Sequence, residues 1–127
     1  MIKIITKKID PNQLNDLCQE YFKTFVKIVV DIEKQIMAVG GELHADAEAL
    51  LIEHGSKQSN LWGANFYPFK TTGNRIEYTA LINIRPSDDN PSMEILSESI
   101  RGKVHDLSQR LLLMPTESIP LGPITDV

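Results

Sequence analysis

The feature that most constrains the fold of this chain is a stretch rich in valine and isoleucine, residues 26–41. β-Branched residues favour strands, and the polar residues 33–35 divide the stretch into two halves. Gly40 and Gly41 then end it. The apolar spacing also fits a helix, but one continued from residue 10 would far exceed the mean globular helix of about 11–12 residues. We therefore predict a β-hairpin here.

Further strand and helix signals lie on both sides of this hairpin. The sequence predicts a strand at residues 2–5, a helix opened by Asp10 and Pro11, a helix at residues 43–54 ended by Gly55, strands at residues 61–67 and 76–85, and a last helix capped by Ser97. The apolar stripe of the first helix comprises Leu14, Leu17, Cys18, Tyr21, Phe22 and Phe25. The order β-α-β-β-α-β-β-α predicts an α+β fold, with a small antiparallel or mixed sheet of about five strands and helices mainly on one face.

The composition excludes several classes of protein. With 127 residues, 42% of them hydrophobic, the chain is expected to form one domain with its own core. Its net charge of −4, with no basic run longer than Lys7 and Lys8, argues against nucleic acid as a partner. No apolar stretch approaches the ~20 residues that cross a bilayer, so no membrane partner is expected. Cys18 has no second cysteine to pair with, so we expect a buried thiol in a cytoplasmic protein.

Proline sets the C-terminal residues 114–127 apart from the domain at residues 1–113. Three prolines in this tail prevent regular secondary structure, so we expect it to be extended. The tail also carries the apolar residues Ile119, Leu121 and Ile124. We therefore expect it to rest either on its own domain or on a neighbouring subunit of a homo-oligomer.

Side chains suited to acid–base chemistry concentrate in the predicted helix at residues 43–54. At about 100° per residue, His44 and Glu48 project toward the apolar side of this helix, whereas Asp46 and Glu53 project toward solvent. His44 and Glu48 are also one helical turn apart. These two side chains are therefore close enough to share a proton or a ligand.

Polar partners for this pair are expected on the strands that follow. An inward carboxylate is costly unless it is paired, and the predicted strand at residues 76–85 places Asn83 and Arg85 on its polar face. Asn65 joins them if the two last strands pair as a hairpin. The candidate site is thus the group His44, Glu48, Asn65, Asn83 and Arg85.

Two interpretations of this group remain open. In one it is a structural network built on a buried ion pair between Arg85 and Glu48. In the other, His44 and Glu48 are catalytic and Asn65, Asn83 and Arg85 bind a ligand. No metal site is expected, because Glu48 stands where a zinc protease helix has its second histidine. No cofactor can be assigned.

Three functions are compatible with these residues. The first is a small binding or regulatory module. The second is a hydrolase or isomerase in which His44 is the acid or base, Glu48 orients it and Arg85 binds an anionic group of the substrate. The third is an interaction protein of the toxin–antitoxin kind, which rests on size and the tail alone.

The chain resembles a family of small uncharacterised prokaryotic proteins, a domain of unknown function. Three segments carry the resemblance: Gly-Gly-Glu-Leu-His-Ala-Asp-Ala-Glu at residues 40–48, Leu-Trp-Gly-Ala-Asn-Phe-Tyr-Pro at residues 61–68 and Ile-Asn-Ile-Arg-Pro at residues 82–86. It extends over residues 2–112 and leaves the tail outside. The resemblance implies a free-standing domain that contains the hairpin, and it implies no activity, cofactor or catalytic residue.

Overall fold

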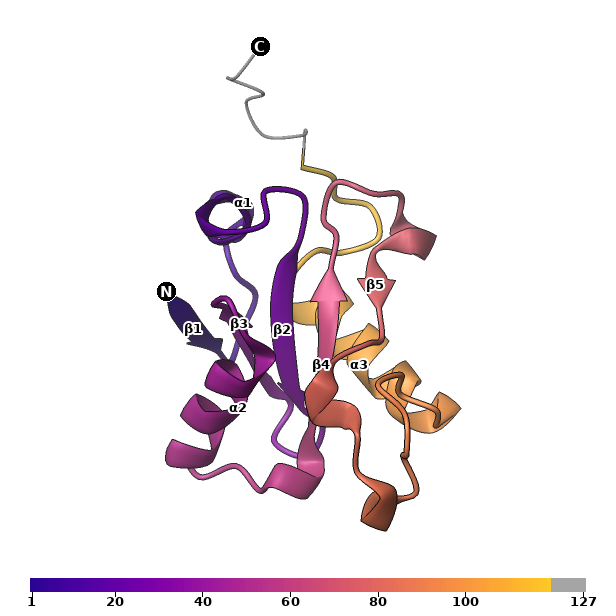
Figure 1. Cartoon of the computed structure of the whole chain (residues 1–127). Coiled ribbons are helices and arrows are strands. Elements are labelled where there is room, and N and C mark those ends of the chain that lie inside the picture. Colours follow the sequence, from indigo (N-terminus) through magenta and orange to yellow (C-terminus); the bar gives the residue numbers. More distant parts are fainter. Residues whose placement is uncertain (120–127) are drawn as a thin grey trace.

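Five strands form one antiparallel sheet in the order β1-β3-β2-β4-β5 (Figure 1). The structure is a computed structural model that describes residues 1–119. The strands are β1 (Ile2–Ile5), β2 (Val26–Asp31), β3 (Ile36–Gly40), β4 (Leu61–Phe66) and β5 (Ile76–Glu77), and the helices are α1 (Pro11–Glu20), α2 (His44–Glu53) and α3 (Glu98–Leu111). The predicted α+β class and element order are confirmed.

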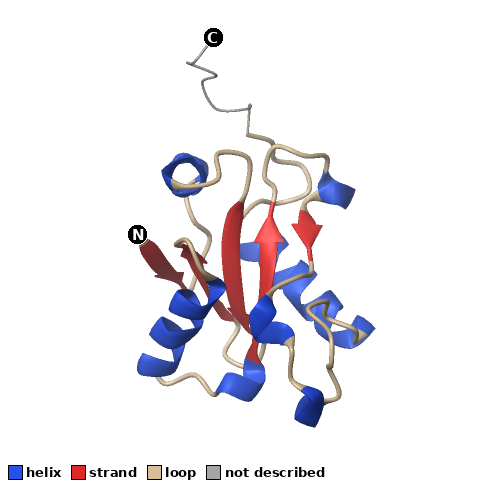
Figure 2. Cartoon of the chain, in the orientation of Figure 1, coloured by secondary structure: helices blue, strands red, loops and turns tan. Residues whose placement is uncertain are grey.

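Helices cover both faces of the sheet, with the larger core on one side (Figure 2). On that side α1 and α3 pack against inward residues of the strands, among them Ile28, Val30, Met37, Val39, Trp62 and Phe66. On the opposite side α2 buries Ala47 and Leu51 against Val29, Ala38 and Leu61. Two of the three helices thus share one face, as predicted, and α2 alone covers the other.

The predicted hairpin is confirmed as β2 and β3, which pair from Ile28 opposite Val39 to Asp31 opposite Ile36. Asp31 organises its turn. One carboxylate oxygen accepts hydrogen bonds from two backbone N–H groups of the turn, at 3.0 and 2.9 Å, and the other accepts from the Ser56 hydroxyl at 2.6 Å. Because Asp31 is fully buried, these donors replace the water that its charge loses.

The first helix begins as predicted and ends earlier than its apolar stripe. Asp10 caps it, since its carboxylate accepts a hydrogen bond from the Asn12 N–H at 2.7 Å. The buried residues of α1 are Leu14, Leu17 and Cys18. Beyond Glu20 the chain turns, so the aromatic part of the stripe, Tyr21, Phe22 and Phe25, lies outside the helix.

The predicted strand at residues 76–85 is wrong. Only Ile76 and Glu77 form β5, and residues 81–83 form a 3₁₀ helix. Isolated bridges join Thr79 to Glu94 and Arg85 to Asn90. The Asn83 side-chain amide and the Arg85 guanidinium bond the β4 backbone where a longer strand would have paired with it. The alternating pattern of residues 76–85 does not show that side chains, and not a strand, bond this edge of β4.

The described part of the tail rests on its own domain. Arg75, 6% exposed, donates hydrogen bonds to the carbonyl oxygens of Met114 at 3.3 Å and Glu117 at 2.7 Å. The Thr72 hydroxyl donates to the Pro115 carbonyl at 2.9 Å, and Ile119 packs against the larger core. Residues 120–127, with Leu121 and Ile124, lie outside the described residues. No helix within residues 1–119 is long and apolar enough to cross a membrane.

Candidate functional site

His44 lies in the first turn of α2, directly after a glycine turn. Gly40 and Gly41 have positive φ angles of 107° and 87°, a conformation that other residues adopt only with strain. A side chain at Gly41 would also come within 2.8 Å of Ile2. The glycine pair thus lets the chain turn sharply from β3 into α2, which directs His44 toward the sheet.

The hydrogen bond of His44 determines its tautomer. Its Nε2 lies 2.8 Å from the carbonyl oxygen of Ala64, and because a carbonyl can only accept, Nε2 carries the proton. Burial lowers the pKa of His44; the bond to Ala64 opposes this shift, the charge of Lys27 adds to it, and the Asn65 amide opposes it. The imidazole, 8% exposed, is therefore neutral near pH 7 with a lone pair on Nδ1.

A polar row crosses the sheet beside this imidazole. Lys27 on β2 pairs with Asn65 on β4, which pairs with Glu77 on β5. The Asn65 Nδ2 donates to Glu77 Oε1 at 2.7 Å, and the Tyr67 hydroxyl donates to the same oxygen at 3.4 Å. We call His44, Lys27, Asn65, Glu77 and Tyr67 the His44 cluster.

The side-chain amide of Asn65 forms hydrogen bonds through its nitrogen and not through its oxygen. Its Oδ1 is buried and accepts no hydrogen bond from any residue within 1–119. The amide favours the charged form of His44, so the two groups are near each other, but no hydrogen bond of normal geometry joins them. While the imidazole is neutral, Nδ1 of His44 and Oδ1 of Asn65 are both acceptors and no proton lies between them.

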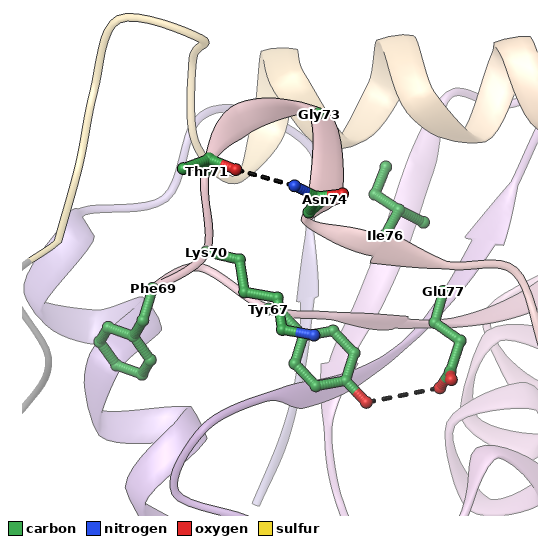
Figure 3. Close-up of a pocket in the computed structure, with 8 residues that line it drawn as sticks. All are labelled: Tyr67, Phe69, Lys70, Thr71, Gly73, Asn74, Ile76 and Glu77. Atoms are coloured by element: carbon green, nitrogen blue, oxygen red, sulfur yellow. Dashed lines mark hydrogen bonds between the residues drawn. The ribbon is translucent and has the colours of Figure 1, made fainter.

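An open pocket of about 690 Å³ adjoins the cluster at Tyr67 and Glu77. Figure 3 shows its lining: Tyr67, Phe69, Lys70, Thr71, Gly73, Asn74, Ile76 and Glu77. The Lys70 side chain lies along the Tyr67 ring, with Nζ 4.2 Å from the ring centroid, and the Tyr67 hydroxyl points to Glu77 (Figure 3). Burial and the neighbouring Glu77 carboxylate raise the pKa of Tyr67. Tyr67 and Glu77 thus belong both to the cluster and to the pocket.

The structure brings two of the five predicted site residues, His44 and Asn65, into this cluster. Glu48 lies one turn further along α2; its Oε2 is buried and accepts no hydrogen bond from the described residues. Asn83 and Arg85 belong to a separate network. Asn83 bonds the backbone of Gly63, with its Oδ1 accepting at 2.8 Å and its Nδ2 donating at 2.9 Å.

The expected ion pair between Arg85 and Glu48 is wrong. The Arg85 Nη1 donates to the Leu61 carbonyl at 2.8 Å, its Nε pairs with Asp88 at 3.0 Å, and the guanidinium carbon lies 4.1 Å from the Trp62 ring centroid. The 3₁₀ turns after β5 carry Arg85 to the start of β4. The error follows from the predicted strand, which would have held Arg85 on the same face as Asn65.

Sequence reasoning missed Lys27 and did not assign a role to Tyr67. Lys27 is the one basic residue within the first half of the Val/Ile stretch, and period-two alternation places it on the same face as Val29. Tyr67 shares its predicted strand face with Asn65. These signals identify the face, but only the pairing of β4 with both neighbours identifies the row.

A small α+β domain with a polar cluster at the edge of an open pocket is thus the class that fold and geometry define. The chain belongs to the family described as Protein of unknown function (DUF5674), whose model matches residues 3–111. No curated protein and no solved structure gives a significant match. No group of three or more His, Cys, Asp or Glu side chains that could hold a metal occurs in the described part of the chain.

Proposed function

We propose that this protein is a small-molecule binding module and that its ligand occupies the pocket beside the His44 cluster. The observation that carries the proposal is the link between the cluster and the pocket: Asn65 and Tyr67 hold the Glu77 carboxylate through hydrogen bonds, and both Tyr67 and Glu77 line the pocket. A ligand that donates hydrogen bonds would pair with Oε2 of Glu77, which accepts none from residues 1–119. The volume of the pocket, about 690 Å³, lies within the range of about 300–1,000 Å³ that is typical of small-molecule sites.

A comparison among the asparagines supports this proposal. Asn83 and Asn90 are buried, and each uses both ends of its amide in hydrogen bonds with backbone groups. Asn65 uses only its Nδ2, toward Glu77. An unsatisfied buried acceptor costs about 1–3 kcal/mol, so the Asn65 amide is not placed for stability alone, and its bond to Glu77 of the pocket lining favours a role in binding.

The enzyme alternative requires Arg85 to bind an anionic group of a substrate next to His44. The guanidinium is instead held by Leu61, Trp62 and Asp88 in a different network. Without that anchor, the geometry supports the binding of a ligand and no particular reaction. The binding module is therefore the function that we propose.

The test uses Asn65→Leu, with Asn12→Leu as the matched control on the exposed start of α1. Thermal shift and calorimetry would measure the binding of a panel of small polar amines, amides, nucleotides and sugars to the wild type and both variants. We expect at least one compound to bind the wild type and the control, and to bind Asn65→Leu at least ~10-fold more weakly, a difference of about 1.4 kcal/mol.

The free energy of unfolding provides the second readout. Asn65→Leu should remain within about 1 kcal/mol of the wild type, because it removes an unsatisfied polar group along with one partly exposed hydrogen bond. A panel in which nothing binds, combined with a large loss of stability in Asn65→Leu, would show that Asn65 is structural and would contradict the proposal.

A further inference from the structure

We infer that the pocket binds a planar heterocycle that presents a hydrogen-bond donor edge and carries an anionic group, the chemistry of a guanine nucleotide. This inference rests on the proposed function and specifies its ligand class. Three features support it: a run of aromatic rings that ends at Tyr67 in the pocket lining, the free oxygen of the Glu77 carboxylate, and the ammonium of Lys70.

The aromatic rings form a continuous surface next to the pocket. Phe22 and Phe25 stack with centroids 4.6 Å apart and planes 14° apart, and the Phe25 centroid lies 5.0 Å from that of Tyr67. All three rings are only partly buried. Aromatic side chains that remain accessible provide stacking surfaces for planar ligands, worth about 1–3 kcal/mol per stacked base.

The acceptors define which edge of the heterocycle would be recognised. Glu77 Oε1 accepts from Asn65 and Tyr67, while its Oε2 takes part in no hydrogen bond with residues 1–119. A carboxylate in the pocket lining matches a ligand edge with two neighbouring N–H donors. Guanine has such an edge, whereas adenine presents an acceptor beside its amino group.

Lys70 accounts for the anionic group, because it lines the pocket. Lys27 and Lys70 each lie over an aromatic ring, 5.1 Å from the Phe22 centroid and 4.2 Å from the Tyr67 centroid, and neither pairs with a carboxylate among the described residues. Lys70 is exposed and lines the pocket. Its flexible stem can swing from the Tyr67 ring to a phosphate, which frees the ring face for stacking.

Calorimetry on the full chain at low salt would test the inference with four probes: GMP, guanosine, AMP and inorganic phosphate. We expect GMP to bind, guanosine to bind about 10-fold more weakly because it lacks the phosphate, and AMP to bind at least 10-fold more weakly because it lacks the donor edge. Inorganic phosphate alone should show no binding at the concentrations that saturate GMP.

Two variants assign these effects to residues. Lys70→Ala should weaken GMP binding about 10-fold and leave guanosine unchanged, whereas Lys103→Ala, an exposed lysine on α3, should change neither. Glu77→Gln should reduce the preference for GMP over AMP at least several-fold. A circular dichroism spectrum and melting temperature like those of the wild type would show that each variant is folded.

The outcomes separate this inference from the proposed function. If an amine, amide or sugar binds through Asn65 while GMP does not, the ligand class is wrong and the binding module stands. Equal binding of GMP and AMP, or binding of inorganic phosphate as tight as that of GMP, would overturn recognition of the donor edge. If no compound binds and Asn65→Leu destabilises the fold, both proposals are contradicted.

Discussion

The side-chain amide of Asn83 pairs with the backbone of Gly63 as the next residue of a β-strand would. The Gly63 N–H donates to Asn83 Oδ1 at 2.8 Å, and Asn83 Nδ2 donates to the Gly63 carbonyl at 2.9 Å. Nδ2 also donates to the Met93 carbonyl at 3.0 Å. Because β5 ends at Glu77, it leaves Gly63 on β4 without a neighbouring strand. The Asn83 amide supplies the hydrogen bonds that the Gly63 N–H and C=O would otherwise lack.

Asn83→Ala should therefore destabilise the protein strongly. It leaves the N–H and C=O of Gly63 without partners in a buried position, at a cost of about 1–3 kcal/mol for each group. Urea denaturation followed by circular dichroism would measure the loss, with the exposed Asn12→Ala as control. A loss below about 1 kcal/mol would show that water replaces the amide and that the pairing adds little.

Gly63→Ala should also be destabilising, because the chain after β5 passes directly over this glycine. A Cβ at Gly63 would lie 2.6 Å from the Ala80 Cβ and 3.1 Å from the Ile82 side chain. Such overpacking costs about 1–3 kcal/mol. Gly102→Ala is the matched control: nothing lies within 4 Å of its added Cβ on α3, so it should stabilise by about 0.5–1 kcal/mol. Equal effects at both glycines would contradict the close approach.

The stability of the protein should depend on pH through His44. Its pKa in the folded state lies below the ordinary value of 6.5, mainly because of burial, so the unfolded chain binds the proton first as the pH falls. The contribution to stability is present above pH 6.5 and decreases below it, by at most about 1.4 kcal/mol per pH unit. Urea midpoints measured between pH 5 and 8 would show this slope.

His44→Gln should flatten this dependence, because glutamine does not titrate and its amide N–H can still reach the Ala64 carbonyl. The exposed His54→Gln serves as control and should keep the slope of the wild type. If His44→Gln and the wild type have parallel stability profiles from pH 5 to 8, His44 is not the group responsible.

Arg75 should control the attachment of the C-terminal segment. Arg75→Ala removes the hydrogen bonds to Met114 and Glu117, so amide exchange and protease cleavage at residues 114–119 should increase. Exchange in β2 and β3 should remain slow in the same sample. Faster exchange in these strands as well would mean that Arg75 supports the whole fold.

Two truncations would test whether the tail also docks on a neighbouring subunit. Removing residues 120–127 leaves the Arg75 contacts in place, whereas removing residues 114–127 deletes them. Light scattering would give the molecular mass of each. The proposal of a docked tail predicts a smaller assembly after either truncation, and an unchanged mass with unchanged stability would contradict it.

Cys18 should be unreactive in the native protein. It is fully buried, and burial raises the pKa of its thiol to about 12, so almost no thiolate forms at neutral pH. Ellman's reagent should label it only after unfolding in urea. Rapid labelling without denaturant would show that the core around α1 opens locally.

The parts of the fold that the sequence predicted depend on local signals. The β-branched residues and the Gly40-Gly41 turn indicate β2 and β3, and Asp10 with Pro11 indicates the start of α1. The site was predicted only in part. His44 and Asn65 do lie near each other. This part was predictable because helical periodicity and strand alternation identify the faces on which the two residues lie.

The remainder of the site depended on pairing over long distances. Alternation over residues 76–85 resembles a strand, yet Asn83 and Arg85 bond the β4 backbone with their side chains, and the chain leaves the sheet after Glu77. A local pattern records which side chains are apolar and which are polar. It does not record whether a backbone edge is bonded by another strand or by a side-chain amide.

The sequence by itself determined the α+β class, the order of its elements and the helix face on which His44 lies, because capping and periodicity act between near neighbours. Only the tertiary structure decided the composition of the His44 cluster. The row Lys27, Asn65 and Glu77 exists because β4 pairs with β2 on one side and β5 on the other. Such contacts depend on sheet order and register, which are set by packing of the whole chain.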